Sequence, residues 1–153
     1  MNAPDWPSHL SSEELRTATL AIERPPADTH AIRNRMALAA RILDQLSETP
    51  RVPTLVIIKA PLAVIRAVPI TDEMIVGRHS DCQLPVPEGK TMSRQHFHLR
   101  KADGLFIIKD LGSRNGTFIN DPKTRLTQPR ALRDGDMIFA GEIAFLFVNA
   151  CED

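Results

Sequence analysis

Three short stretches of the sequence combine side chains that suit the binding of an anion. They cover residues 77–78, 93–96 and 113–116, and they bring together arginine, serine, asparagine and glycine. Guanidinium, hydroxyl and amide groups donate hydrogen bonds, and those from arginine to an anion are charge-assisted. If the fold brings the three stretches together, their donors can surround one tetrahedral anion. The candidate donors are Arg78, Ser93, Arg94, Ser113, Arg114 and Asn115.

Each of these stretches adjoins a predicted β-strand. Short apolar or alternating runs separated by Gly- and Asp-containing turns are typical of strands, whereas no pattern of alternating helices follows residue 54. The sequence therefore predicts an all-β antiparallel sandwich that presents the donors from loops at the strand ends. The predicted strands cover residues 55–58, 63–65, 74–76, 97–100, 105–108, 117–119, 136–140 and 143–148.

The amino-terminal third of the chain has a different pattern, which predicts helices. Ser11 and Glu14 form a capping box ahead of an apolar stretch that continues to Ile22, and a second helix is predicted over residues 29–46. The apolar stripe of the second helix must pack against another surface. That surface is the neighbouring helix, the β-domain or a partner, and with a partner the helices would provide self-association. The stripe contains Ile32, Met36, Ala39, Leu43 and Leu46.

Composition narrows the function classes. The 153 residues have a formal net charge of zero, so no overall field favours nucleic acid or an anionic membrane. No apolar run approaches the length of a membrane span, and no secretory signal is recognised, so we expect a cytoplasmic protein. Cys82 and Cys151 show no framework spacing, which indicates reduced thiols.

In their order along the chain, the three stretches resemble the forkhead-associated (FHA) domain family, and residues 132–138 resemble its late turn and strand. The resemblance covers about residues 52–149. It implies three parts: a helical extension and linker at 1–51, an FHA domain at 52–149, and a short tail at 150–153.

The resemblance also implies a role for each candidate residue. Arg78 and Ser93 match residues that contact phosphothreonine, and Arg94 and Ser113 match positions that add bonds to it. Asn115 matches the residue that holds the peptide backbone, and Arg114 lies where selectivity is set. Three further residues match positions that support the site without touching ligand, namely Gly77, His96 and Gly116.

The implied function is therefore a non-catalytic adaptor. Its partner would be a phosphothreonine-containing protein, either a substrate of a Ser/Thr kinase or the kinase itself. Binding would need no cofactor, metal or nucleic acid. The alternative is a phosphate-independent scaffold that uses a sheet surface or the amino-terminal helices. A threonine before residue 54, such as Thr49, would provide a further option if phosphorylated: the amino-terminal segment could then occupy the site of its own chain or that of a neighbouring molecule.

Three departures from the family pattern bear on local structure. Phe97 stands where a small residue is common, so packing after the histidine is open. Asn120 is followed by Asp121 and Pro122, which disfavours a tight two-residue hairpin. Lys90, in a proline-rich loop, is either a solvated lysine or a further ligand contact.

Catalytic and metal-binding alternatives have weaker support. Ser93, His96 and Asp110 could be imagined as a triad, but no nucleophile elbow is present, and three residues along an extended strand place side chains on opposite faces. His96 and His98 share a strand face by spacing, yet no compact cluster of cysteine and histidine accompanies them. The sequence also lacks phosphate-binding glycine loops of nucleotide enzymes.

Overall fold

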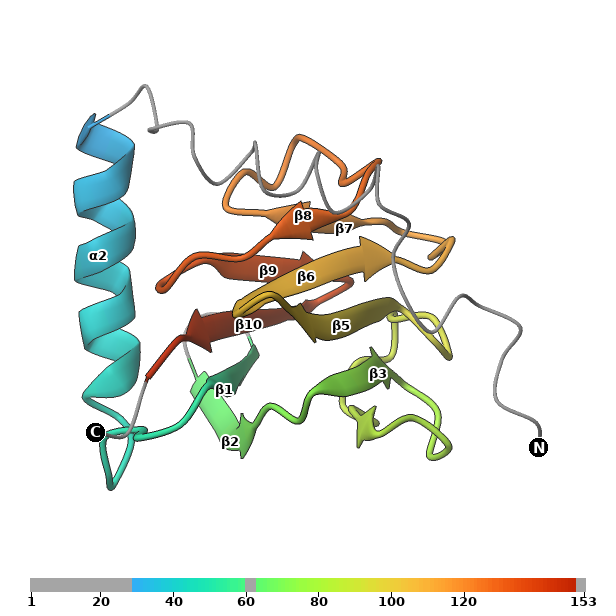
Figure 1. The fold of residues 1–153 in the computed structure, drawn as a ribbon, viewed down its shortest axis with the longest axis horizontal. Helices are drawn as coiled ribbons and strands as arrows, with labels where there is room; N and C mark the ends of the chain where they lie inside the picture. Colours follow the sequence, from blue (N-terminus) through green and yellow to red (C-terminus); the bar gives the residue numbers. More distant parts are fainter. Residues whose placement is uncertain (1–28, 60–62, 151–153) are drawn as a thin grey trace.

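The computed structural model describes residues 29–59 and 63–150, which form a helix and two packed five-stranded β-sheets (Figure 1). We call β2-β1-β10-β9-β7 the first sheet and β4-β3-β5-β6-β8 the second sheet. Neighbouring strands are antiparallel except β3 and β4, which are parallel. The predicted all-β sandwich with an amino-terminal helix is therefore confirmed. The elements are α2 (Thr29–Leu43), β1 (Thr54–Lys59), β2 (Ala63–Pro69), β3 (Glu73–Gly77), β4 (Leu84–Pro85), β5 (Phe97–Ala102), β6 (Leu105–Asp110), β7 (Thr117–Ile119), β8 (Arg130–Ala131), β9 (Met137–Ala140) and β10 (Ile143–Val148).

The eight predicted strands are all present, and β4 and β8 are additional. Each of these two has only two residues, too few to show alternation. The disfavoured hairpin after Asn120 is indeed absent from the described residues, since β7 pairs with β9 whereas β8 pairs with β6. Asn120 itself has a positive φ of 63° and leads into a long connection.

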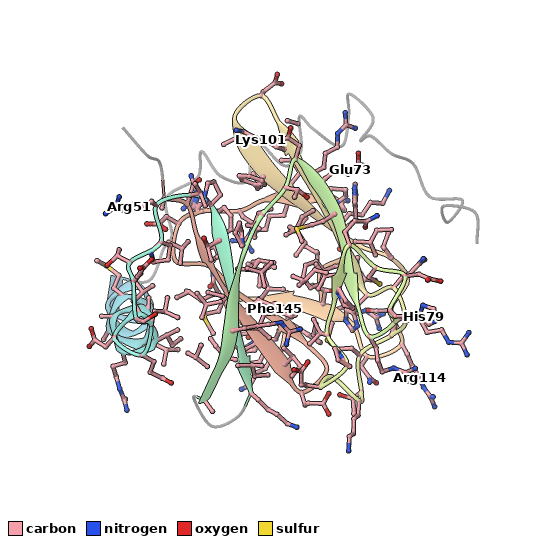
Figure 2. All side chains as sticks on the ribbon, turned by 90° about the horizontal axis from the view of Figure 1, so that it is seen from below. Arg51, Glu73, His79, Lys101, Arg114 and Phe145 are labelled. Atoms are coloured by element: carbon pink, nitrogen blue, oxygen red, sulfur yellow. The ribbon has the colours of Figure 1, made fainter. Side chains whose placement is uncertain are left out.

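The core lies between the inner faces of the two sheets. Phe145 of β10 packs edge-on against Phe97 of β5, with ring centroids 5.3 Å apart (Figure 2). Phe97 is fully buried, so the bulky residue after the histidine fills the core. Burial of each large apolar side chain stabilises the fold by about 1.5–3 kcal/mol. The inner-face residues include Leu55, Ile57, Met74, Val76, Phe97, Leu99, Phe106, Ile108, Ile138, Phe145 and Phe147.

Helix α2 packs on the outer face of the first sheet, which Figures 1 and 2 show on one side of the molecule. Ile42 is fully buried against Val56 and Leu146, so β1 is covered on both faces. The sequence left three possible surfaces for the apolar stripe of this helix. The carboxyl half of the stripe packs against one of them, the β-domain, while Met36 is 67% exposed.

The helix ends earlier than the pattern predicts. Its last residue is Leu43 instead of residue 46, because the amides of Gln45 and Leu46 bond to carbonyls three residues back and tighten the last turn. The predicted helix over residues 11–22 lies outside the described residues. Within the part of the chain that the structure describes, no helix is long and apolar enough to span a membrane.

Candidate functional site

The first two donor stretches lie side by side where β3 ends and β5 is about to begin. The amide of Arg78 donates to the Ser93 carbonyl at 3.0 Å, and the amide of His79 donates to the Arg94 carbonyl at 3.2 Å. This approach requires a glycine at position 77, because a Cβ atom there would lie 2.2 Å from the Arg94 carbonyl oxygen. Because Gly77 has no side chain, the two main-chain segments can approach closely, and this approach places Arg78 and Arg94 side by side.

The third stretch, between β6 and β7, contacts the second. The amide of Arg114 donates to Oγ of Ser93 at 3.0 Å, and Nδ2 of Asn115 donates to the Thr91 carbonyl at 2.8 Å. The fold therefore brings the three stretches together at one end of the sandwich. We call this surface the rim and define it by Arg78, Ser93, Arg94, Arg114 and Asn115.

The rim side chains keep donors that face solvent. Arg78, Arg94, Arg114 and Asn115 are exposed and Ser93 is half-buried. Arg78 donates through Nε to the Met92 carbonyl at 3.2 Å, which fixes the guanidinium and leaves its terminal nitrogens for other acceptors. Ser93 Oγ accepts from the Arg114 amide, so its hydroxyl hydrogen can still be donated. Arg114 projects from the rim in Figure 2.

Beneath the rim, Asp110 organises the third stretch. Its carboxylate accepts hydrogen bonds from the amides of Gly112 and Ser113 at 3.0 and 3.1 Å and from the hydroxyl of Thr117 at 2.7 Å. The Ser113 hydroxyl donates to the same carboxylate at 2.5 Å. Ser113 is only 3% exposed, so the structure places it inside the loop and not among the exposed donors.

His96 connects the second stretch to the third. Its Nδ1 accepts from the Ser93 amide at 3.0 Å, and its Nε2 is 2.8 Å from the Gly116 carbonyl oxygen. Both contacts are satisfied by the neutral ring protonated at Nε2. Burial lowers the pKa of His96, which favours this neutral form. Gly116 has a φ of +87°, a conformation that suits glycine.

Three residues that the sequence did not indicate also hold the loops. Thr91 and Glu142 bond reciprocally: Glu142 Oε1 accepts from the Thr91 amide, and Thr91 Oγ1 accepts from the Glu142 amide, both at 2.9 Å. Arg125 donates to the Ser113 carbonyl. Thr91 and Glu142 are 51 positions apart, so no local pattern could have linked them.

The imagined triad is not assembled. The Ser93 hydroxyl oxygen contacts the Arg114 amide, His96 contacts main-chain atoms of Ser93 and Gly116, and Asp110 binds the third stretch. Residues 93–96 precede β5 instead of lying along it. The described residues contain no group of three metal-ligating side chains, and Cys82 is a buried free thiol. His98 instead contacts Glu73, at 3.1 Å.

Comparison with known families agrees with this geometry. Residues 74–141 match the family model of the FHA domain, and this range contains the whole rim. The protein therefore carries an FHA domain. The matched range lies within the predicted 52–149, whose exact limits stay a prediction.

Curated relatives come from several organisms. The chain is 30% identical to the oxoglutarate dehydrogenase inhibitor of Corynebacterium diphtheriae over 96 residues. This alignment covers 62% of the chain and 64% of the relative. It is 32% identical over 73 residues to the glycogen accumulation regulator GarA of Mycolicibacterium smegmatis, and this alignment covers 48% of the chain and 44% of GarA. The chain thus spans just under two thirds of the length of the Corynebacterium relative.

Solved structures include FHA domains. The FhaA FHA domain, solved with the intracellular domain of Rv3910, has a TM-score of 0.53 and 28% identity, covering 62% of this chain and 98% of that one. A structure from work on phosphothreonine-dependent FHA domain interactions has a TM-score of 0.53 and 26% identity, with coverages of 62% and 95%.

Proposed function

We propose that this FHA domain is a non-catalytic adaptor that binds phosphothreonine in a partner protein. The observation that carries the proposal is the convergence of three loops on one rim whose donors face solvent. A phosphate on a peptide has a charge of about −1.5 to −2 near neutral pH and three strong acceptor oxygens. Its partner would be a substrate of a Ser/Thr kinase or the kinase itself.

The phosphate-binding group consists of Arg78, Ser93 and Arg94. Arg78 is held in place by its Nε bond to the main chain, so its terminal nitrogens are positioned before ligand arrives. Preorganisation of this kind reduces the entropy lost on binding. The two guanidiniums would neutralise the phosphate, and the Ser93 hydroxyl would add a short hydrogen bond.

Asn115 and Arg114 would bind the rest of the peptide. Asn115 uses one amide hydrogen on the Thr91 carbonyl and retains its side-chain oxygen and second hydrogen for an extended backbone. Arg114 is exposed next to it, where it can contact residues that follow phosphothreonine.

Ser113 takes a different role from the one that the resemblance implies. Because its hydroxyl hydrogen is donated to Asp110 and the residue is buried, we propose that Ser113 supports the loop in place of binding phosphate. We propose the same supporting role for Gly77, His96 and Gly116.

Isothermal titration calorimetry of the full chain tests the function. The ligands are a degenerate phosphothreonine peptide pool, its phosphoserine counterpart and its unphosphorylated counterpart. We expect micromolar binding to the phosphothreonine pool and little heat from the unphosphorylated one. Loss of one charge-assisted bond costs about 1.5–3 kcal/mol, so Arg78→Ala should weaken binding about tenfold or more.

Arg51→Ala is the matched control, since Arg51 is exposed on the linker, far from Arg114 in the view of Figure 2. Binding that is equal with and without phosphate, or unaffected by Arg78→Ala, would contradict the proposal and favour the phosphate-independent scaffold.

A further inference from the structure

A turn of the first sheet contacts the loop that leads to the rim. Gly141 and Glu142 form this turn, which joins β9 to β10. The carboxylate of Glu142 accepts a hydrogen bond from the Thr91 amide, and the Glu142 amide donates to Oγ1 of Thr91, both at 2.9 Å. We call this reciprocal pair of bonds between Thr91 and Glu142 the clasp. It connects the first sheet to the loop that follows β4 of the second sheet.

Close packing around the turn places Thr91 against the first sheet. Gly141 has a φ of +61°, and a Cβ atom there would lie 2.5 Å from Oγ1 of Thr91, so a side chain at this position would collide with the clasp. A Cβ atom at Gly89 would lie 3.1 Å from Cγ1 of Ile143, the first residue of β10. Residues 89–91 therefore lie against the end of the β9–β10 hairpin.

The clasp holds the residue that orients Asn115. The Thr91 carbonyl accepts from Nδ2 of Asn115 at 2.8 Å, so Thr91 connects Glu142 to the side chain that would bind the peptide backbone. Thr91 and Asn115 are exposed, whereas Glu142 is half-buried. Residues joined in one hydrogen-bond network act on one another, so loss of the clasp should loosen the Asn115 side chain.

The phosphate-binding group is held by other contacts. The Ser93 amide donates to Nδ1 of His96, and the Ser93 carbonyl accepts from the Arg78 amide, both at 3.0 Å. Nε of Arg78 donates to the carbonyl of Met92, whose side chain is buried in the core. Glu142 takes part in none of these contacts. Loss of the clasp should therefore affect the part of the rim that binds peptide and leave the part that binds phosphate in place.

We propose that Glu142 is a positioning residue, which acts through Thr91 and Asn115 to make the site select an extended phosphothreonine peptide over a single phosphorylated amino acid. This inference rests on the proposed function, which assigns Asn115 to the peptide backbone. Free phosphothreonine presents the same phosphate as the peptide but no backbone beyond its own residue. The clasp therefore contributes to the affinity for a peptide and not to the affinity for its phosphate.

Titration of the full chain with the phosphothreonine peptide pool and with free phosphothreonine tests the selection. Glu142→Ala should raise the Kd for the peptide pool about two- to tenfold, as expected for one lost hydrogen bond, and leave the Kd for free phosphothreonine within about twofold. Glu142→Gln is the matched control, because its amide oxygen can still accept from Thr91, and it should keep most of the peptide affinity. Both variants are neutral at this position, so their difference reports the hydrogen bond and not the charge.

Two results of these titrations would overturn the proposal. Equal weakening for both ligands would show that Glu142 supports the whole rim, and equal peptide affinities in the alanine and glutamine variants would show that the clasp does not act on the site. Retained binding of free phosphothreonine also shows that the alanine variant is folded.

A measurement without ligand separates this inference from the proposed function. The heteronuclear nuclear Overhauser effect of the Asn115 side-chain amide reports its motion on the ps–ns timescale. Its value should fall in Glu142→Ala and stay near that of the unsubstituted protein in Glu142→Gln. An unchanged value in Glu142→Ala would overturn the positioning role even if the protein binds phosphothreonine. If the value falls but binding by the unsubstituted protein does not require phosphate, the proposed function and the peptide selection fail, while the positioning of Asn115 stands.

Discussion

Arg78, Arg94 and Arg114 are exposed at the rim, whereas Asp110 and His96 lie beneath it with their polar atoms bonded to the protein. Both layers are polar, and both belong to the same loops. We call the layer beneath the rim, which consists of His96, Asp110 and Ser113, the support layer. The rim side chains keep hydrogen-bond donors that face solvent, whereas the polar atoms of the support layer are used to fix the geometry of the loops. Substitutions should therefore separate them: a change in the support layer lowers stability and affinity, and a change in the rim lowers affinity alone.

The largest effect is expected for Asp110→Ala. This change removes the acceptor of four hydrogen bonds, from the amides of Gly112 and Ser113 and the hydroxyls of Ser113 and Thr117. Each buried donor left without a partner costs about 1–3 kcal/mol, so we expect a loss of about 3 kcal/mol or more in the free energy of unfolding. Urea unfolding measures it. Asp134→Ala, at an exposed turn aspartate, is the control, and an equal loss there would contradict the prediction.

Gly77→Ala should have the next largest effect on stability. The new Cβ would lie 2.2 Å from the Arg94 carbonyl oxygen, so the two strand ends must separate. We expect a loss of about 2 kcal/mol or more in unfolding free energy, as for other overpacked sites, together with weaker peptide binding. Gly104→Ala is a useful comparison because its Cβ would meet nothing within 4 Å, although φ is +79°. That backbone strain alone should cost about 1 kcal/mol, and equal losses at the two positions would argue against the close-approach explanation.

Stability should fall as pH falls, because burial lowers the pKa of His96 in the folded state below its ordinary value of 6.5. Above that value neither the folded nor the unfolded chain protonates the ring, and the contribution of His96 is complete. Below it the unfolded chain binds a proton that the folded chain resists, so stability is lost towards the folded pKa. The slope contributed by one such group is at most about 1.4 kcal/mol per pH unit.

Unfolding free energies measured between about pH 7.5 and 5.5 check this expectation. His96→Gln should reduce the slope of unfolding free energy against pH. The slope that remains should include a contribution from His98, whose pKa is also lowered by burial. His79→Gln serves as the control because His79 is exposed. An unchanged slope in His96→Gln would show that another group dominates the pH dependence.

Sequence patterns predicted the sandwich because its strands alternate or are continuously apolar and are separated by Gly- and Asp-containing turns. One such turn joins β5 to β6, where Asp103 and Gly104 have positive φ values of 53° and 79°. The patterns could not predict β8, since its two residues are ordered by pairing with β6. They also overextended α2, because the tightening of its last turn is not visible in an apolar stripe.

The candidate site was predictable in its residue types but not in its layers. Arginine, serine and asparagine can donate hydrogen bonds in any fold, so the three short stretches that combine them predict a candidate anion site. Whether a donor faces solvent depends on which acceptor lies near it, and the position of Asp110 turns Ser113 inward. The bond between Arg114 and Ser93 joins residues 21 positions apart, and such contacts emerge only when strands pair.

The smallest effect on stability is expected for Arg94→Ala, although Arg94 takes part in both layers. Its carbonyl accepts from the His79 amide and from Cys82 Sγ, and alanine preserves that carbonyl. The exposed side chain is what the substitution removes, so unfolding free energy should change by less than about 0.5 kcal/mol. Affinity for the phosphothreonine pool should fall several-fold, with partial recovery in Arg94→Lys, which retains the charge but not the fork. Gly77→Ala displaces the Arg94 carbonyl, whereas Arg94→Ala removes only the side chain. The two variants therefore separate the contribution of the Arg94 main chain to stability from that of its side chain. If Arg94→Ala destabilised the protein as much as Gly77→Ala, its side chain would belong to the support layer.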